Sequence, residues 1–307
     1  MTDFWVVGPI AWDRVLHVPL LPHSGGFVQA SEAPERPGGS GANTAIALAS
    51  TGANVHIVGY LGEDEPGARL RAVLDAAAVD VGFVHARDGH TSEVVILVEP
   101  SGERAMIGMW PDLLHTVPVP VADITAGDVV YFAGWREEFL PAMTKLTAAG
   151  VVVATVPPQP LTPALPATYA IGSQTQYGDQ NLQEIISTGD GTLRAVVVTR
   201  GPDGVVIHDR DGSTACPAQP VAAVDTTGAS DAFAAGFLRQ IAGDGTLEEA
   251  AAGGIAWASV AVQAPASIPR LGSLSARAAM CHRGGNRTHP ARHTGSPALA
   301  GSRWRVL

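Results

Sequence analysis

Apolar and polar residues alternate in blocks along most of the chain, and these blocks predict strands and helices that follow one another. Short apolar runs that end at a turn residue predict buried strands, and longer stretches with apolar residues at helical spacing predict helices. The strands are predicted at 4–7, 55–58, 129–132, 151–155, 169–171 and 195–199, and the helices at 39–51, 64–78, 230–240 and 247–261. Strands that alternate with helices predict an α/β fold around a mainly parallel sheet.

Two stretches depart from this alternation. Residues 14–37 are interrupted by prolines and glycines, and residues 91–110 contain two apolar runs separated by a Pro-Ser-Gly-Glu turn, which predicts a hairpin. A second hairpin is predicted from the runs at 205–208 and 214–218. Because the pieces at 14–37 and 91–110 do not fit the layers of the main sheet, we expect them to form a small β-lid above it.

The C-terminal part of the sequence has a different composition from the rest. From position 267 to the end there are seven Arg and no Asp or Glu, and no apolar stripe continues past residue 271. We therefore predict a folded domain at 1–273 and an Arg-rich tail at 274–307 that is disordered or foreign to the fold. The tail's cysteine and histidines do not predict zinc, since a second Cys at short spacing and an apolar helix are missing.

Charge and cysteine content exclude several classes of protein. The 307 residues carry a formal net charge of −10, which argues against a nucleic-acid partner. No apolar run is long enough to span a bilayer, and the N-terminus lacks the basic start of a signal peptide. Two cysteines are too few for a disulfide framework, so we expect reduced thiols in a reducing compartment. These features predict a cytoplasmic protein with no membrane partner.

The sequence from Asp225 to Asp231 carries the strongest chemical signal. Small residues at 228–230 directly precede a predicted helix, so main-chain N–H groups and the helix dipole are available to an anion such as a phosphoryl group. Asp231 then falls in the first turn, where it can accept the proton of an attacking hydroxyl. Taken alone, the same pattern also fits an Asp that only complements a helix N-terminus.

A second glycine-rich turn, residues 38–43, also enters a helix. Its glycines allow close approach of a ligand, and Asn43 offers both a donor and an acceptor to paired hydroxyls. A dinucleotide site fits poorly, because Thr44 occupies the third glycine position of that fingerprint and no strand precedes the turn. A purely structural turn stays open as an alternative.

Lysine scarcity restricts the ways in which this chain can bind phosphate. Lys145 is the only lysine, and it does not follow a glycine, so a Walker A loop and the lysine of protein kinases are both missing. Phosphate binding must then use main-chain amides, Arg or a metal. Thr199, Gly201 and Gly204 lie at a strand end, where a nucleotide or a plain turn fits equally well. Asp13 fits either a hydroxyl-binding carboxylate or a solvated loop acid.

In this order and separation, the motifs at 38–43, 59–64, 199–204 and 225–231 resemble the PfkB family of carbohydrate and nucleoside kinases. The resemblance covers about residues 4–270. It implies a ribokinase-like three-layer α/β/α sandwich with a small β-lid that commonly forms a dimer. It further implies ATP as phosphoryl donor, Mg²⁺ bound through ATP and water with no direct protein ligand, and activation by a monovalent cation such as K⁺.

The resemblance also implies a role for each matching residue. Asp231 matches the catalytic base. The remaining matches are the anion hole at Gly228, Ala229 and Ser230; the acceptor site at Asp13, Gly39, Ser40 and Asn43; and the nucleotide site at Thr199, Gly201, Gly204 and Ser173. The expected reaction is ATP-dependent phosphorylation of a primary hydroxymethyl group on a sugar or nucleoside.

The chain departs from the family pattern at several points. Ser230 replaces the usual third glycine, and Ser173–Gln176 replaces an Asn-x-x-Glu motif whose carboxylate helps to hold Mg²⁺. A catalytically weak member that binds sugar or nucleotide as a sensor is therefore the second hypothesis. Ser40 stands where ribokinases have Lys, which disfavours ribose. Three arginines, Arg14, Arg36 and Arg104, form no visible cluster, so an unphosphorylated sugar or a nucleoside is favoured.

Overall fold

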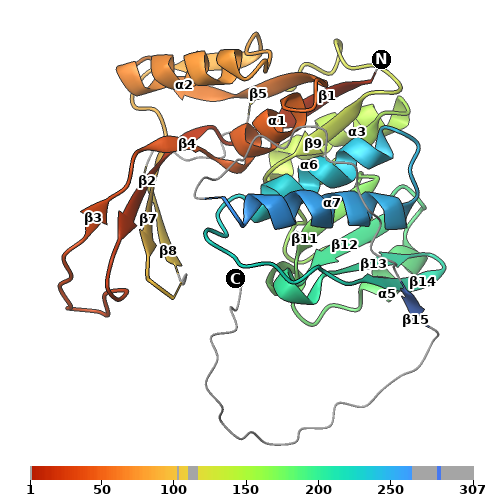
Figure 1. Ribbon diagram of the computed structural model, residues 1–307. Helices are drawn as coiled ribbons and strands as arrows, with labels where there is room; N and C mark the ends of the chain where they lie inside the picture. The colour runs from red at the N-terminus through yellow and green to blue at the C-terminus, as the bar shows by residue number, and fades with distance from the viewer. Residues whose placement is uncertain (1, 102–103, 110–116, 265–281, 285–307) are drawn as a thin grey trace, which may run out of the picture.

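The computed structural model describes residues 2–101, 104–109, 117–264 and 282–284. They form a body around a ten-stranded sheet and a five-stranded small sheet that projects from it (Figure 1). The strand order of the large sheet is β15-β14-β13-β12-β11-β10-β9-β1-β5-β6. In that order its strands are His282–Gly284, Gly212–Cys216, Val205–Asp209, Ala195–Thr199, Tyr169–Ser173, Val152–Thr155, Val129–Phe132, Asp3–Val7, Asn54–Gly62 and Val84–Arg87.

The seven strands from β12 to β6 pair in parallel, which confirms the predicted parallel sheet. β13 and β14 add an antiparallel hairpin to one edge, as the runs at 205–208 and 214–218 predicted. β15 pairs with β14 and comes from the tail at 274–307, where no element was expected. The rest of that tail lies outside the described residues.

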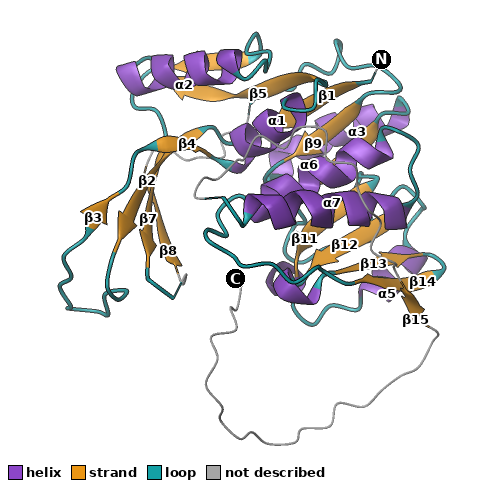
Figure 2. Ribbon diagram, in the orientation of Figure 1, coloured by secondary structure: helices purple, strands orange, loops and turns teal. Residues whose placement is uncertain are grey.

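Side-chain alternation along the strands builds a core on each face of the large sheet. Phe4 and Val6 on β1 join one core, while Trp5 and Val7 join the other. The first face is covered by α1 (Ser40–Ala49), α2 (Glu65–Ala76), α6 (Ala229–Ile241) and α7 (Leu247–Ala261), which confirms the four predicted helices. The other is covered by α3 (Leu140–Ala148), α4 (Gln174–Tyr177) and α5 (Leu182–Thr188). The result is the expected three-layer α/β/α sandwich (Figure 2).

Helices α6 and α7 pack against each other through glycines. A Cβ added to Gly236 would lie 2.7 Å from the carbonyl oxygen of Gly253, and one added to Gly254 would lie 2.6 Å from the ring of Phe233. The absence of side chains at these positions lets the two helix backbones approach closely. This contact holds α6 against the body and fixes the direction of its N-terminus.

The small sheet has the strand order β3-β2-β7-β8, and β4 pairs with β2. Its strands are β2 (Ala11–His17), β3 (Ser31–Glu32), β4 (Arg36–Gly38), β7 (Glu93–Val98) and β8 (Arg104–Met109). β7 and β8 form the predicted antiparallel hairpin, and β2 pairs with β7 in parallel. Asp13, expected in a loop after the first strand, lies within β2 and is buried.

Within the part of the chain that the structure describes, no helix is long and apolar enough to cross a membrane. Cys216 on β14 is buried and disulfide-bonded, whereas the cysteine count had led us to expect reduced thiols. Cys281, the other cysteine of the sequence, lies outside the described residues.

Candidate active site

The N-terminus of α6 presents main-chain donors at the turn predicted to bind an anion. Gly228 precedes the helix in a left-handed conformation with φ of 76°, which favours glycine, and it provides no side-chain cap. Ala229 donates its N–H to the Thr226 carbonyl oxygen, but the N–H groups of Ser230 and Asp231 make no hydrogen bond to another described residue. Two donors at the positive end of the helix are therefore uncommitted within the described part of the chain.

Asp231 is the third residue of α6 and is half-buried. The Asn43 side-chain amide donates a hydrogen bond of 2.8 Å to Oδ2 of Asp231. Loss of hydration raises the pKa of Asp231 to about 6, while the hydrogen bond from Asn43 and the positive charge of Arg104 act to lower it. A carboxylate with this pKa is ionised at neutral pH and is a stronger base than an ordinary Asp.

The glycine-rich turn before α1 is packed against the end of β1. The amides of Gly41 and Ala42 both donate to the Pro9 carbonyl oxygen, at 3.1 and 3.2 Å. Ser40 donates its hydroxyl to the carbonyl oxygen of Ala133, directly after β9, at 2.6 Å. The turn thus lies where β1 and β9 meet. In the sheet, β5 lies on the outer side of β1 and β10 lies on the outer side of β9, so the strand order reverses between β1 and β9. Open α/β sheets bind ligands at such switch points.

Asp13 approaches the same turn from β2. Its carboxylate lies so close to Gly38 that a Cβ added there would be 1.9 Å from Oδ1 of Asp13. Asn43 is also buried, and its side-chain Oδ1 has no hydrogen-bond partner among the described residues. The structure therefore gathers the predicted acceptor residues Asp13, Gly39, Ser40 and Asn43 around one turn, and Asn43 links this turn to Asp231.

The predicted nucleotide residues form a separate group at the ends of β11 and β12. Ser173 and Thr199 are direct partners across these two parallel strands. Gly201 and Gly204 lie in the turn to β13 with φ of 55° and 86°, and a Cβ on Gly204 would lie 2.2 Å from the Cys216 carbonyl oxygen. Packing of the turn therefore explains Gly204 without a ligand. Among the described residues, this group makes no hydrogen bond to Asp231 or Asn43.

Ser173 caps the short helix α4 together with Gln176. The Gln176 Oε1 accepts the Ser173 N–H at 2.7 Å and the Ser173 hydroxyl at 3.2 Å. Gln176, at the position where the resemblance expects a carboxylate, is thus used in a capping box. The described residues contain no group of three or more His, Cys, Asp or Glu that could hold a metal ion.

The motif at 59–64 has a structural role. Asp64 caps α2 by accepting the Gly67 N–H at 2.9 Å, and it also accepts the Thr91 N–H at 2.8 Å. Burial acts to raise the pKa of Asp64, but the hydrogen bonds from Thr91 and Gly67 outweigh it and hold the pKa below its usual value. Asp64 therefore connects α2 to the segment that leads into β7.

Two arginines near Asp231 were not assigned to the site from the sequence. Arg36 forms an ion pair with Asp225, and Arg104 donates a hydrogen bond to Thr227. The partners are 189 and 123 residues apart, so no local pattern predicts these contacts. Arg14 instead pairs with Glu32 at the protein surface.

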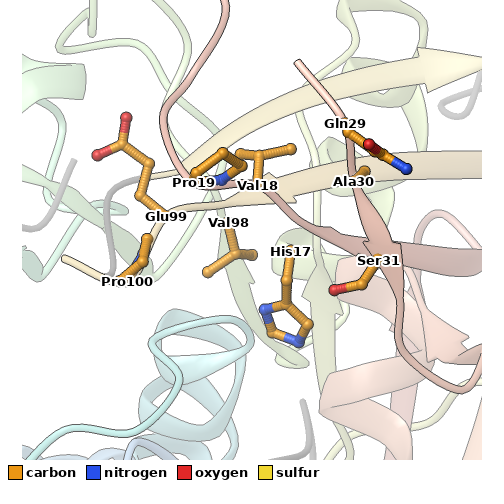
Figure 3. Close-up of a pocket in the computed structure, with 9 residues that line it drawn as sticks. All are labelled: His17, Val18, Pro19, Gln29, Ala30, Ser31, Val98, Glu99 and Pro100. Carbon is orange, nitrogen blue, oxygen red and sulfur yellow. The ribbon is translucent and has the colours of Figure 1, made fainter.

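The hollow drawn in Figure 3 lies elsewhere. It has a volume of about 570 Å³ and is formed by residues 17–19, 29–31 and 98–100 of the small sheet and its loops. It includes none of the predicted site residues. The chemistry-bearing groups are instead those at the starts of α1 and α6.

Comparison with known proteins places this arrangement among phosphotransferases. Residues 1–271 match the family described as pfkB family carbohydrate kinase. The chain is 31% identical to an ATP-dependent ribose-1-phosphate kinase of Halopiger xanaduensis, over 79% of this chain and 86% of that protein. It is 30% identical to a fructokinase of Salmonella typhimurium, over 78% and 85% of the two chains.

Among solved structures, the fold is similar to Arabidopsis thaliana ribokinase complexed with ribose and ATP. The TM-score is 0.71 at 23% identity, and the match covers 88% of this chain and 96% of that chain. This likeness shows that the body and small sheet have the ribokinase fold.

Proposed function

The chain belongs to the pfkB family of carbohydrate kinases, and from this membership we propose that it transfers the terminal phosphoryl group of ATP to a primary hydroxymethyl group of a sugar or nucleoside. One observation carries the proposal. Asp231 lies in the first turn of α6 beside main-chain amides that bind no other described residue. This pairing of a base with anion-binding donors is what transfer of a phosphoryl group to an alcohol requires.

In the proposed reaction, Asp231 accepts the proton of the acceptor hydroxyl. Asn43 holds Oδ2 of Asp231, and we assign Oδ1 to the hydroxyl. As the proton leaves, the hydroxyl oxygen forms a bond to the γ-phosphorus, and the bond from this phosphorus to the β–γ bridging oxygen breaks to release ADP. The amides at 228–231, of which those of Ser230 and Asp231 bind no other described residue, stabilise the negative charge of the phosphoryl oxygens during transfer.

The acceptor and nucleotide residues are assigned with different support. Asp13, Gly39, Ser40 and Asn43 surround one turn, and the unpartnered buried Oδ1 of Asn43 suits a sugar hydroxyl. Thr199, Gly201, Gly204 and Ser173 are assigned to the nucleotide because they lie together at the ends of β11 and β12. Ser173 has the weakest support of these, since its N–H and hydroxyl already bond to Gln176.

Mg²⁺ belongs to the proposal as an ion carried by the phosphates of ATP and by water, where it would neutralise phosphate charge. K⁺ or another monovalent cation is kept from the family resemblance, without a named ligand. No step of the mechanism above passes through either ion.

The small sheet is proposed as a lid over the acceptor and as the surface of a homodimer. Four exposed apolar side chains, on β8 and on the loop between β2 and β3, support the second role. They are Leu20, Phe27, Met106 and Ile107, with 59%, 92%, 60% and 51% of their surface accessible. Residues 1–273 are proposed as the kinase domain and 274–307 as an appended tail. The cytoplasmic location also stays a proposal, and the disulfide at Cys216 is the observation against it.

A sensor that binds sugar or nucleotide without efficient turnover is the second candidate. Gln176 favours it, because a carboxamide committed to a helix cap cannot supply the carboxylate that the resemblance expects near Mg²⁺. The uncommitted amides beside Asp231 favour the enzyme instead.

Measurement of ADP release separates the two candidates. The purified protein is mixed with Mg²⁺–ATP and ribose, ribose 1-phosphate, fructose or a nucleoside. Asp231→Asn should lower turnover by about 10²–10⁴-fold while ATP still binds, since only the proton acceptor is lost. Asp75→Asn, at an exposed position on α2, is the matched control. Wild-type turnover equal to that of Asp231→Asn with every acceptor would contradict the kinase and support the sensor.

A further inference from the structure

Two arginine side chains cross from the small sheet to the loop that precedes α6. Arg36 on β4 donates from Nη1 to Oδ2 of Asp225 at 2.7 Å. Arg104 on β8 donates from Nη1 to the Thr227 hydroxyl at 2.9 Å. The two arginines come from different strands, so two separate parts of the small sheet contact the same four-residue loop, 225–228.

These contacts affect the anion hole directly, because loop 225–228 leads into the start of α6. Oδ1 of Asp225 accepts the N–H of Thr227 at 2.8 Å, so one carboxylate binds both Arg36 and the loop's own backbone. Thr227 is buried and is followed by Gly228, whose left-handed conformation directs the chain into α6. The position of Asp225 and Thr227 therefore sets where the amides of Ser230 and Asp231 point.

The Arg36 contact differs from an ordinary surface ion pair. The side chains of Arg36 and Asp225 are 16% and 19% exposed, and the remaining Arg36 nitrogens, Nε and Nη2, are buried without a partner among the described residues. Among the described residues, Asp225 is thus the only hydrogen-bond acceptor of the Arg36 guanidinium. The Arg14–Glu32 pair, with exposures of 46% and 62%, is solvated and contributes little to holding any element in place.

We propose that Arg36 and Arg104 are positioning residues through which the small sheet holds the anion hole in its active geometry. This inference rests on the proposed function and deepens it. The small sheet then does more than cover the acceptor. Its contact with loop 225–228 aligns the donors that stabilise the transferred phosphoryl group, so catalysis depends on where the small sheet lies.

The two arginines can be told apart by their effect on Asp231. Loss of hydration raises the pKa of this carboxylate, while Asn43 on α1 lowers it through a hydrogen bond and Arg104 on β8 lowers it through its charge. The charge of Asp231 in turn adds to the raised pKa of the buried Tyr131 on β9. Loss of the Arg104 charge should raise the pKa of Asp231, whereas we expect no such shift from Arg36, whose charge is paired with Asp225. Only the Arg104 variant should therefore move the acid limb of the pH profile.

The test compares Arg36→Gln and Arg104→Gln with Arg14→Gln, the control on the outer side of the same small sheet. Steady-state ADP release is measured with Mg²⁺–ATP and whichever of ribose, ribose 1-phosphate or fructose the wild type turns over. Both site variants should lower kcat by about 10²-fold with KM for ATP nearly unchanged, because misplaced donors affect the transition state most. Arg36→Lys should restore part of the kcat, and Arg104→Gln should shift the acid limb to higher pH.

Hydrogen exchange provides a measurement that needs no acceptor. Deuterium uptake of the peptide over 221–233 should rise in Arg36→Gln and Arg104→Gln but not in Arg14→Gln. If Arg36→Gln does not fold, Arg36→Lys replaces it, and Thr227→Val, which removes only the acceptor of Arg104, replaces Arg104→Gln in the same case. Uptake and kcat in the site variants equal to those of Arg14→Gln would overturn the inference. A wild type without turnover whose exchange still responds would instead contradict the proposed function and leave the loop contact established.

Discussion

The two glycine-rich helix starts of this protein look alike in sequence but use their main chain differently. Each begins after a glycine with positive φ, 84° at Gly39 and 76° at Gly228, and neither glycine provides a side-chain cap. At α1 the amides of Gly41 and Ala42 bind the Pro9 carbonyl oxygen, whereas at α6 the amides of Ser230 and Asp231 bind no described residue. A glycine-rich turn before a helix is therefore an anion site only where the tertiary structure leaves its donors free.

The largest expected effect comes from removing one main-chain N–H donor at the start of α6, which tests whether the free donors there are needed for activity. Ser230→Pro deletes an N–H in the first turn, where a helix tolerates proline because these groups have no helical partner. We expect kcat to fall about 10²–10³-fold, as for the loss of one oxyanion donor elsewhere. ADP release measures the effect, and melting curves check that the fold is kept.

Ser230→Ala is the matched control, since it removes the hydroxyl of this exposed residue and keeps the amide. It should retain kcat within a few-fold. If the alanine and proline variants lose activity equally, the side chain and not the main-chain donor is responsible.

At α1 the expected effect is on stability. A Cβ on Gly41 would lie 2.7 Å from the carbonyl carbon of Gly8 and 2.8 Å from the carbonyl oxygen of Pro9, and backbone atoms cannot move aside easily. Gly41→Ala should therefore lower the free energy of unfolding by about 1–3 kcal/mol. Denaturant titration measures it.

Gly243→Ala serves as the control for α1, because its added Cβ would come no closer than 3.5 Å to the atoms around it. Its stability should stay close to that of the wild type. Equal stabilities of the two alanine variants would show that the start of α1 is less tightly packed than the contacts of Gly41 indicate.

The smallest expected effect is a difference between the two helix starts in how they respond to pH. The first turn of α1 has no acidic residue, while that of α6 has Asp231, whose pKa is raised to about 6 by loss of hydration. As a base it must be ionised, so kcat/KM should fall about tenfold per pH unit below pH 6 and level off above it. A flat kcat/KM from pH 5 to 8 would contradict the role of Asp231.

The same raised pKa has a consequence for stability. Because the folded-state pKa exceeds the unfolded value, the folded state favours protonated Asp231, and this contribution is lost as pH rises through about 6. Asp231→Asn should then stabilise the protein more, relative to wild type, at pH 7.5 than at pH 4.5. Thermal melts at the two pH values measure the difference, with Asp75→Asn as control.

The strands and helices of the body were predictable because their signals are local. The buried run before Gly8 and the helical periodicity at 247–261 each depend on a few neighbouring residues, and the structure confirms both elements. The pieces at 14–37 and 91–110 were recognised as irregular, but the parallel pairing of β2 with β7 was not predictable, since it joins residues far apart in sequence. The same limit hid Asp13 within a strand and hid both arginine contacts.

By itself, then, the sequence determined the order of elements, the parallel sheet, the two glycine-rich helix starts and the family resemblance, because periodicity and motif spacing act over short segments. Only the tertiary structure decided which helix start keeps its donors free, which side chain holds Asp231 and which arginines reach loop 225–228. The last two depend on atoms that folding brings together from residues more than a hundred positions apart.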